Sequence, residues 1–180
     1  DSSILLYIID GMGHGVVPAL TTFAVAGVIR HYIAQYSDFE GLMQHLVHTL
    51  QGLLDEAEQL SFTFFNIDLK SKELKYSIGG MYPALVIKDE ELLNVKGNNI
   101  PMMSFTQEVE IDTITFEYLD KLLLYSDGLV EEEVNNELFH PEALIADEML
   151  LSSSFEVFNN RSNEDDITIV YLDNLEDEPS

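Results

Sequence analysis

Short segments of alternating apolar and polar residues fill the middle of the chain and constrain its fold more than any other feature. Turn-prone pairs such as Gly79-Gly80 separate them, so too little chain remains between consecutive segments for a crossover helix. Strands joined this closely pair antiparallel. The pattern predicts strands over 61–68, 73–78, 84–89, 92–96, 109–115 and 121–126, with a last strand over 167–172.

Helical periodicity precedes these strands. Residues 16–33 have Pro18 in their first turn, where a helix tolerates it. Asp38 is the expected N-cap of a second helix over 39–54, whose apolar residues form one stripe. A further helix is predicted over 141–151. Because the helices are separate in sequence from the antiparallel strands, the pattern indicates an α+β domain.

The first helix combines apolar and small residues at helical spacing. These positions are Leu20, Phe23, Ala24, Gly27, Val28 and Ile33. Small residues let two backbones approach, so we expect this helix to pack closely on its neighbour through Ala24, Ala26 and Gly27.

Acidic residues dominate the charge. The chain has 33 Asp and Glu against 8 Lys and Arg, for a formal charge of −25, yet 46% of its residues are hydrophobic. That apolar content supports a buried core, and we expect one domain over 1–175 with an acidic tail over 176–180. Because the basic residues occur singly, neither nucleic acid nor anionic lipid is an expected partner. Divalent cations and basic protein surfaces fit the charge better.

Cysteine is absent, which excludes a disulfide scaffold, a thiolate zinc site and a cysteine nucleophile. Apolar stretches are shorter than the roughly 18 residues of a spanning helix, and no signal-peptide pattern opens the chain. We therefore expect a cytoplasmic protein with no membrane contact. The chain opens directly on a strand-like run over 4–9, which suggests that it is N-terminally truncated and lacks its first strands.

Carboxylates stand at three predicted strand ends: Asp10, Asp127 and the pair Asp165-Asp166. If these ends are adjacent, the like charges repel and raise each other's pKa, and a divalent cation relieves the conflict. Hard oxygen ligands suit Mg²⁺ or Mn²⁺. The alternative is structural, because Asp-Gly is a common turn dipeptide and Asp165-Asp166 could be ordinary loop charge. Spacing alone leaves both interpretations open.

Four motifs follow one another in the order of a known phosphatase family. They read Asp10-Gly11-Met12-Gly13-His14-Gly15, Gly79-Gly80-Met81-Tyr82-Pro83-Ala84-Leu85, Leu123-Leu124-Tyr125-Ser126-Asp127-Gly128-Leu129-Val130-Glu131 and Glu164-Asp165-Asp166-Ile167-Thr168-Ile169-Val170. They resemble the D-x-x-G-H-G, A-G-H-x-P-x-L, L-x-Y-T-D-G-L-x-E and D-D-x-T elements of the bacterial PPM-type protein phosphatases. The similar branch is the stage II sporulation protein E type, which includes phosphatases of sigma-factor regulation. Together the motifs span residues 10–170.

The resemblance implies an αββα sandwich of two antiparallel sheets flanked by helices. It implies hydrolysis of phosphoserine or phosphothreonine on a protein by water activated at a site of two Mn²⁺ or Mg²⁺ ions, without a phosphoenzyme. Carried over by position, Asp10 ligates both metals, Gly11 offers its carbonyl oxygen, and Asp127 and Asp165 complete the protein ligands. His14 is implied as a proton donor to the leaving alkoxide or as an orienting group; the alternative is that it only holds its loop.

This chain departs from the family pattern in three places. Family members carry another metal-binding aspartate in an earlier G-D-x-x-D element, which this chain does not contain. Gly79 stands where alanine is usual and Met81 where histidine is usual, and we interpret both as tolerated drift because neither position is a ligand. The missing element leaves open a second function, a catalytically silent binding or dimerisation module with the same fold.

The resemblance also implies partners. These are a phosphorylated regulatory protein such as an anti-sigma-factor antagonist, an N-terminal sensor or receiver domain outside this chain, and a second copy in a homodimer. The helix after Gly15 is the expected switch for such a regulator. His45 and His48 have the i,i+3 spacing of a metal-binding pair, but no acid accompanies them, so these two and the remaining histidines, His31 and His140, are expected bystanders.

Overall fold

The computed structural model describes residues 3–11, 16–33, 35, 38–131, 133–134, 137–138, 140–146 and 167–173. Its contacts divide the chain into two compact units. Unit 1 comprises Asp1–Met81 and Gly97–Thr115, and unit 2 comprises Tyr82–Lys96 and Phe116–Ser180.

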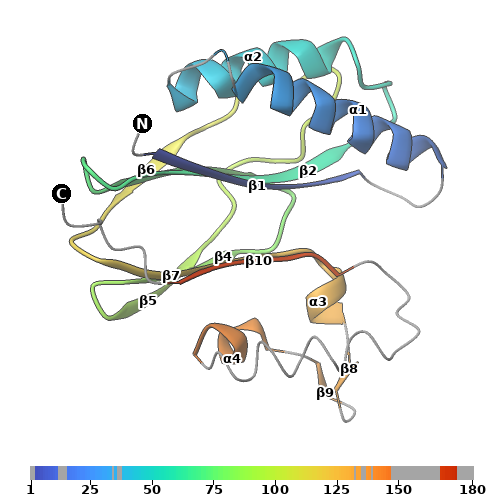
Figure 1. Ribbon diagram of the computed structural model, residues 1–180. Coiled ribbons are helices and arrows are strands. Elements are labelled where there is room, and N and C mark those ends of the chain that lie inside the picture. Colours follow the sequence, from blue (N-terminus) through green and yellow to red (C-terminus); the bar gives the residue numbers. More distant parts are fainter. Residues whose placement is uncertain are drawn as a thin grey trace. The chain divides into compact units, whose positions relative to one another are not determined.

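Unit 1 is a four-stranded antiparallel sheet with two helices on one face (Figure 1). The strand order is β1-β2-β3-β6, so the first strand of the chain pairs with a strand that follows both helices. The elements are β1 (Ser3–Gly11), α1 (Val16–Ile33), α2 (Phe39–Gln51), β2 (Leu60–Asp68), β3 (Glu73–Gly79) and β6 (Asp112–Thr115).

The predicted cap of α2 is confirmed, and so is its apolar stripe as far as Leu50, but the helix ends at Gln51 and not at Leu54. A side-chain oxygen of Asp38 accepts a hydrogen bond of 2.6 Å from the Gly41 amide, as an N-cap does. The stripe faces the sheet and is buried there with Phe62 and Phe64 of β2. Its buried members are Phe39, Leu42, Met43, Leu46, Val47 and Leu50.

The predicted buried face of α1 is wrong for most of its residues, although Val28 packs against the core as expected. Val25 and Ile29 are fully buried, whereas Leu20 and Phe23 are 62% and 76% exposed. Gly27 is also exposed, and a Cβ built there has no neighbouring atom within 4 Å. Because this helix is apolar around most of its circumference, helical spacing could not show which side packs on the sheet.

Gly27 offers a direct test of this arrangement. Glycine in a helix interior is less stable than alanine by about 1 kcal/mol, and Gly27→Ala meets no steric conflict, so we expect the free energy of unfolding to rise by about 0.5–1 kcal/mol. Urea denaturation followed by circular dichroism measures the change. Ala26→Gly is the matched reversal and should lower stability by a similar amount. A Gly27→Ala variant that unfolds at lower urea would mean that this face is packed.

The strand predicted over 109–115 is shorter than expected, because side chains replace its backbone partners. β6 begins only at Asp112. Before it, the Asn99 side chain accepts a hydrogen bond of 2.7 Å from the Glu110 amide and donates one of 3.0 Å to the Glu110 carbonyl oxygen. The Ser77 hydroxyl donates to the same carbonyl oxygen. These side chains satisfy a backbone that a neighbouring strand would otherwise pair.

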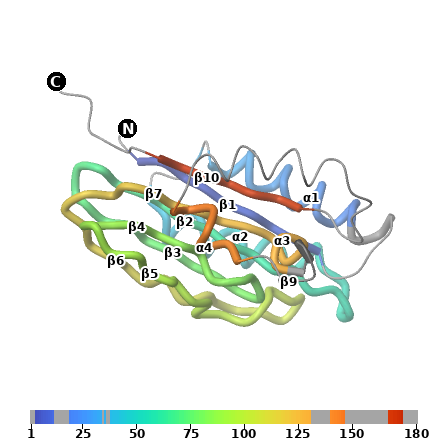
Figure 2. The backbone as a smooth tube through the Cα atoms, turned by 90° about the horizontal axis from the view of Figure 1, so that it is seen from below, coloured from blue at the N-terminus to red at the C-terminus, as the bar shows by residue number. Residues whose placement is uncertain are grey.

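Unit 2 contains a second four-stranded antiparallel sheet, in the order β10-β7-β4-β5, and a small β8-β9 hairpin. Figure 2 shows α3 at the end of β7. The helix predicted over 141–151 is described over 141–146 only. The elements are β4 (Ala84–Lys88), β5 (Glu91–Val95), β7 (Leu119–Tyr125), α3 (Gly128–Glu131), β8 (Glu133–Val134), β9 (Glu137–Leu138), α4 (Pro141–Ala146) and β10 (Ile169–Asp173).

Antiparallel sheets and separate helices confirm the α+β class. Every strand pair described in the two large sheets is antiparallel. The expectation that closely joined strands pair is confirmed for β2–β3 and β4–β5, but β3 and β4, on either side of Gly79-Gly80, belong to different sheets. Within the described ranges, none of the helices has the length and apolar character needed to cross a membrane.

Candidate active site

Asp10 and Gly11 belong to a strand and do not form a turn. In the β1–β2 ladder Asp10 pairs with Ser61 and Gly11 with Leu60, so the structural interpretation of Asp-Gly as a turn dipeptide is wrong here. Both residues are half-buried. The ladder fixes their backbone, which places the Asp10 carboxylate at one defined end of the unit 1 sheet.

The glycine-rich loop starts at the same end of that sheet, because Gly79 pairs with Phe62, next to Ser61. Gly80 has a φ of +70°, a left-handed conformation that glycine adopts without strain. A Cβ at Gly80 would also lie 2.5 Å from Pro101 Cγ and 2.6 Å from Ser61 Oγ. The loop therefore depends on glycine for its backbone and for its close packing.

Close packing also explains why glycine occupies position 79. A Cβ at this position would collide with the carbonyl oxygen of Ile100 and would lie 2.5 Å from a ring carbon of Phe62. The family's usual alanine therefore does not fit in this chain. What we interpreted as drift is a local adjustment to the neighbouring segment.

Asp127 stands directly after β7 and before α3 in unit 2. Its Oδ1 accepts a hydrogen bond of 2.9 Å from the Gly128 amide. The amides of Leu129 and Val130, which an N-cap side chain normally serves, donate instead to the backbone oxygens of Ser126 and Asp127. Helix capping therefore does not account for a half-buried carboxylate at this position.

Ser126 ties the Asp127 strand end to the beginning of β10. Its amide donates to the Thr168 carbonyl oxygen at 3.0 Å, and its hydroxyl accepts from the Thr168 amide at 2.9 Å. Ser126 is only 5% exposed, so its hydroxyl is a buried structural link. It was not among the predicted site residues, although it stands beside Asp127 at the threonine position of the related motif.

Tyr125, the last residue of β7, is a buried aromatic residue two positions before Asp127. Its ring stacks on Tyr82, with centroids 6.3 Å apart. Burial, together with smaller contributions from the charges of Glu142 and Tyr82, raises the pKa of Tyr125 to about 12. The hydroxyl therefore stays protonated at physiological pH and adds no negative charge beside the carboxylate.

The remaining predicted site residues, His14 and Asp165, lie outside the described residues. Asp10 and Gly11 belong to unit 1 and Asp127 to unit 2. Within the described ranges, no group of three or more His, Asp or Glu side chains is close enough to hold a metal ion. Each of Asp10, Gly11 and Asp127 nevertheless carries an oxygen, from a carboxylate or a backbone carbonyl group, of the hard kind that suits Mg²⁺ or Mn²⁺.

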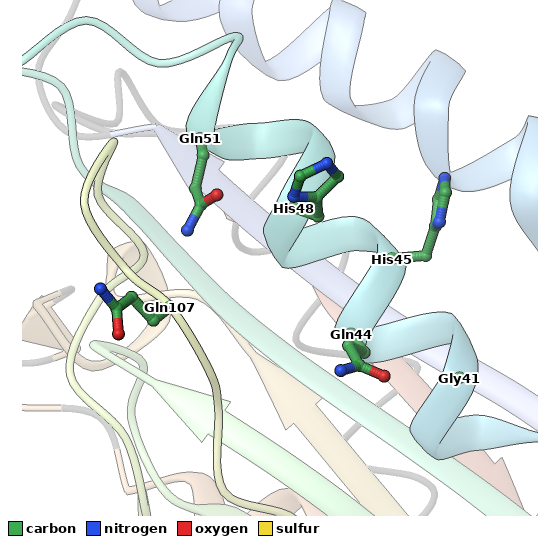
Figure 3. Close-up of a pocket in the computed structure, with 6 residues that line it drawn as sticks. All are labelled: Gly41, Gln44, His45, His48, Gln51 and Gln107. Atoms are coloured by element: carbon green, nitrogen blue, oxygen red, sulfur yellow. The ribbon is translucent and has the colours of Figure 1, made fainter.

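A polar pocket of about 390 Å³ lies beside α2 in unit 1. Figure 3 shows Gln44, His48 and Gln51 projecting from α2, with Gln107 on the neighbouring loop. His45 is turned toward α1, where its ring meets Tyr32 with centroids 4.1 Å apart. Its packing on Tyr32 gives His45 a structural role, so the pair does not act as a two-histidine clamp.

Comparison with known proteins agrees with the four motifs. Residues 1–174 match the family model of stage II sporulation protein E (SpoIIE). The chain is 25% identical over 181 residues to phosphoserine phosphatase RsbP of Bacillus subtilis (strain 168), a match that covers 93% of this chain and 45% of RsbP. The chain thus spans less than half the length of that relative.

Solved structures share the fold. The RsbU and RsbW domains of Rv1364c from Mycobacterium tuberculosis match with a TM-score of 0.74 and 19% identity, over 94% of this chain and 51% of that chain. The catalytic domain of the serine/threonine protein phosphatase PstP, in complex with 2 manganese ions, matches with a TM-score of 0.67 and 16% identity, over 94% of this chain and 86% of that chain. These similarities confirm the predicted fold class, with two antiparallel sheets and helices. Since the family model covers nearly the whole sequence, the chain belongs to the SpoIIE family of PP2C-type phosphatases.

Proposed function

We propose that this chain hydrolyses phosphoserine or phosphothreonine on a regulatory protein in bacterial signalling, with residues 1–175 as its phosphatase domain and 176–180 as an acidic tail. One observation carries the proposal. The carboxylates of Asp10 and Asp127 each stand at the end of a sheet strand, next to a glycine, in a chain of the SpoIIE family. RsbP, which the chain resembles, is named a phosphoserine phosphatase.

Two divalent cations, Mn²⁺ or Mg²⁺, are part of this proposal. Asp10, the Gly11 carbonyl oxygen, Asp127 and Asp165 would hold them. Such cations supply a Lewis acid that lowers the pKa of a water molecule and stabilises an in-line displacement at phosphorus. The ladder fixes the backbone of Asp10, and the Gly128 amide holds the Asp127 carboxylate, before any ligand arrives.

The reaction transfers the phosphoryl group to water. A bond forms between the water oxygen and phosphorus, and the bond between phosphorus and the seryl or threonyl oxygen breaks. The attacking water gives up a proton to solvent. His14 gives a proton to the leaving oxygen and takes one up again from solvent, and the products are inorganic phosphate and the unmodified side chain. Most of the acceleration then comes from positioning and electrostatics, as is general for phosphoryl transfer.

The proposed partners follow from the same family. The substrate is a phosphorylated anti-sigma-factor antagonist in the cytoplasm, because the sequence resembles the sigma-factor-regulating branch. A sensor or receiver domain N-terminal to this chain controls the activity, with α1 as the element that responds, and the active form is a homodimer. The match covers 45% of the length of RsbP, and this partial coverage supports the proposal of a further domain in the protein to which this chain belongs.

Metal removal tests the function. We expect the chain to release p-nitrophenol from p-nitrophenyl phosphate, and inorganic phosphate from a phosphoserine protein, only with Mn²⁺ or Mg²⁺ in the buffer. Excess EDTA should reduce both rates to the background, and Mn²⁺ added beyond the EDTA should restore them. The measurements are absorbance at 405 nm and a malachite-green phosphate assay, and isothermal titration calorimetry counts the bound ions.

The alternative of a silent module predicts a different result. A folded chain that binds no Mn²⁺ and hydrolyses neither substrate would contradict the phosphatase proposal. Hydrolysis that persists at full rate in EDTA would contradict the metal assignment alone.

A further inference from the structure

Two large apolar side chains are exposed on an uncharged segment of unit 1. Ile100 and Phe105 are 66% and 65% exposed. They belong to residues 97–107, which contain no Asp, Glu, Lys, Arg or His. Single exposed apolar residues are common on protein surfaces, so their meaning depends on how this segment is held and where it lies.

The backbone of this segment is fixed at several points. The amides of Asn98 and Asn99 donate to the Ile78 carbonyl oxygen at 3.1 and 2.9 Å. Met102 and Leu60 exchange two backbone hydrogen bonds of 2.9 Å each. Farther along, the Gln51 side chain donates to the Thr106 carbonyl oxygen at 2.6 Å. Ile100 and Phe105 are therefore presented by an ordered backbone, which lowers the entropy lost when a partner binds.

The segment lies at the Asp10 end of the unit 1 sheet. Leu60 pairs with Gly11 on one side and with Met102 on the other. Two strand spacings of about 4.8 Å therefore separate Met102 from Gly11, or about 10 Å in all. If the phosphate of a substrate is bound at Asp10, a few further residues of that substrate are enough to reach this segment. The residues that carry these contacts are all uncharged: Leu60, Ser61, Gly79, Gly80, Pro101 and Met102.

The negative charge of this chain makes an uncharged surface important for binding a phosphorylated partner. The chain carries a formal charge of −25, and a phosphoseryl group adds about −1.5 to −2 on the partner. A phosphorylated protein is therefore repelled by most of this chain's surface. Residues 97–107 themselves add no like charge to this repulsion, and apolar contact there can supply binding energy.

We infer that residues 97–107 form the docking surface for the phosphoprotein substrate, and that Ile100 and Phe105 receive an apolar side chain near the phosphoserine. This inference rests on the proposed function, because it takes Asp10 as the place of the phosphate. The backbones of Gly11 and Met102 are about 10 Å apart, and an extended chain spans about 3.3–3.6 Å per residue, so a substrate that reaches from Asp10 to this segment spans about three residues. The substrate class is thus a phosphoserine segment with an apolar residue three positions away.

Synthetic peptides test this directly. Two eleven-residue phosphoserine peptides differ only at the positions three residues before and after the phosphoserine, which are leucine in one and serine in the other. With Mn²⁺ present, we expect kcat/KM for the leucine peptide to be about tenfold higher, chiefly through KM. The ratio should fall to about one in Ile100→Ser and in Phe105→Ser.

Matched controls come from unit 2. Leu92 and Tyr118 are 49% and 71% exposed and lie at the end of their sheet away from Asp127, so Leu92→Ser and Tyr118→Ser should keep the tenfold ratio. Thermal unfolding verifies that each variant is folded. Equal rates on both peptides in the unchanged chain, or a ratio that survives in both Ile100→Ser and Phe105→Ser, would overturn the docking surface. Absence of Mn²⁺-dependent hydrolysis of p-nitrophenyl phosphate in the unchanged chain would instead refute the proposed function, and the inference with it.

Discussion

Asp127→Asn is expected to lower kcat/KM for p-nitrophenyl phosphate by more than about 100-fold while leaving the fold intact. Asparagine keeps a side-chain oxygen that can accept the hydrogen bond from the Gly128 amide, so the start of α3 is retained. It loses the negative charge that a divalent cation requires from this ligand. Initial rates at increasing Mn²⁺ concentration measure both the loss and the shift in metal requirement.

Asp120→Asn is the matched control for this variant. Asp120 lies on the same strand, β7, near its other end, and the substitution removes the same unit of charge. Its activity should stay within about twofold of the unchanged chain, because screening weakens the effect of a distant charge. Should Asp127→Asn retain comparable activity at low Mn²⁺, the assignment of Asp127 as a metal ligand would be wrong.

Gly79→Ala is expected to destabilise the protein by about 1–3 kcal/mol, although alanine is the usual residue of the related motif. The added methyl group would collide with the Ile100 carbonyl oxygen and the Phe62 ring. The ring can shift, but the carbonyl oxygen belongs to a backbone whose neighbour Asn99 is hydrogen-bonded to Ile78. Chemical denaturation in urea measures the change in unfolding free energy.

Gly97→Ala is the corresponding control on the same segment. A Cβ there meets the Ile78 carbonyl oxygen at 3.4 Å and a methyl carbon of Ile78 at 3.6 Å, which approaches ordinary contact. Its effect should stay within about 0.5 kcal/mol. Equal stability of Gly79→Ala and Gly97→Ala would contradict the tight packing of Gly79.

Local patterns predicted the elements well, because their signals lie within each element. The alternation of β2 and β3 and the Asp38 cap are properties of neighbouring residues, and each was found. The pairing of strands that are distant in sequence could not be predicted from such local patterns. Nothing in the sequence near β1 indicates that it pairs with β2, which begins 49 residues after β1 ends. The prediction of the buried face of α1 was wrong for the same reason, because contact with the sheet determines which apolar side of the helix is buried.

The candidate site shows the same difference between features that local sequence predicts and features that depend on distant contacts. Asp10, Gly11 and Asp127 were predicted from motifs, and the structure places each at the end of a sheet strand. Gly79 was interpreted as drift, because the atoms that exclude a methyl group belong to Phe62 and Ile100, 17 and 21 positions away. Motifs predict which residues carry the chemistry, but contacts with residues distant in sequence determine which substitutions are possible beside them.

The buried hydroxyl of Ser126 determines which substitutions a lineage can accept at that position. The related motif has threonine there, and serine and threonine both provide the oxygen that accepts the Thr168 amide, whereas alanine would leave that amide without it. Exchange between the two hydroxyl residues therefore retains this acceptor, although it counts as a mismatch in an identity score. A search pattern for remote relatives is better written as Ser-or-Thr followed by Asp-Gly. At identities near 20%, chemical equivalence of this kind preserves more information than residue identity.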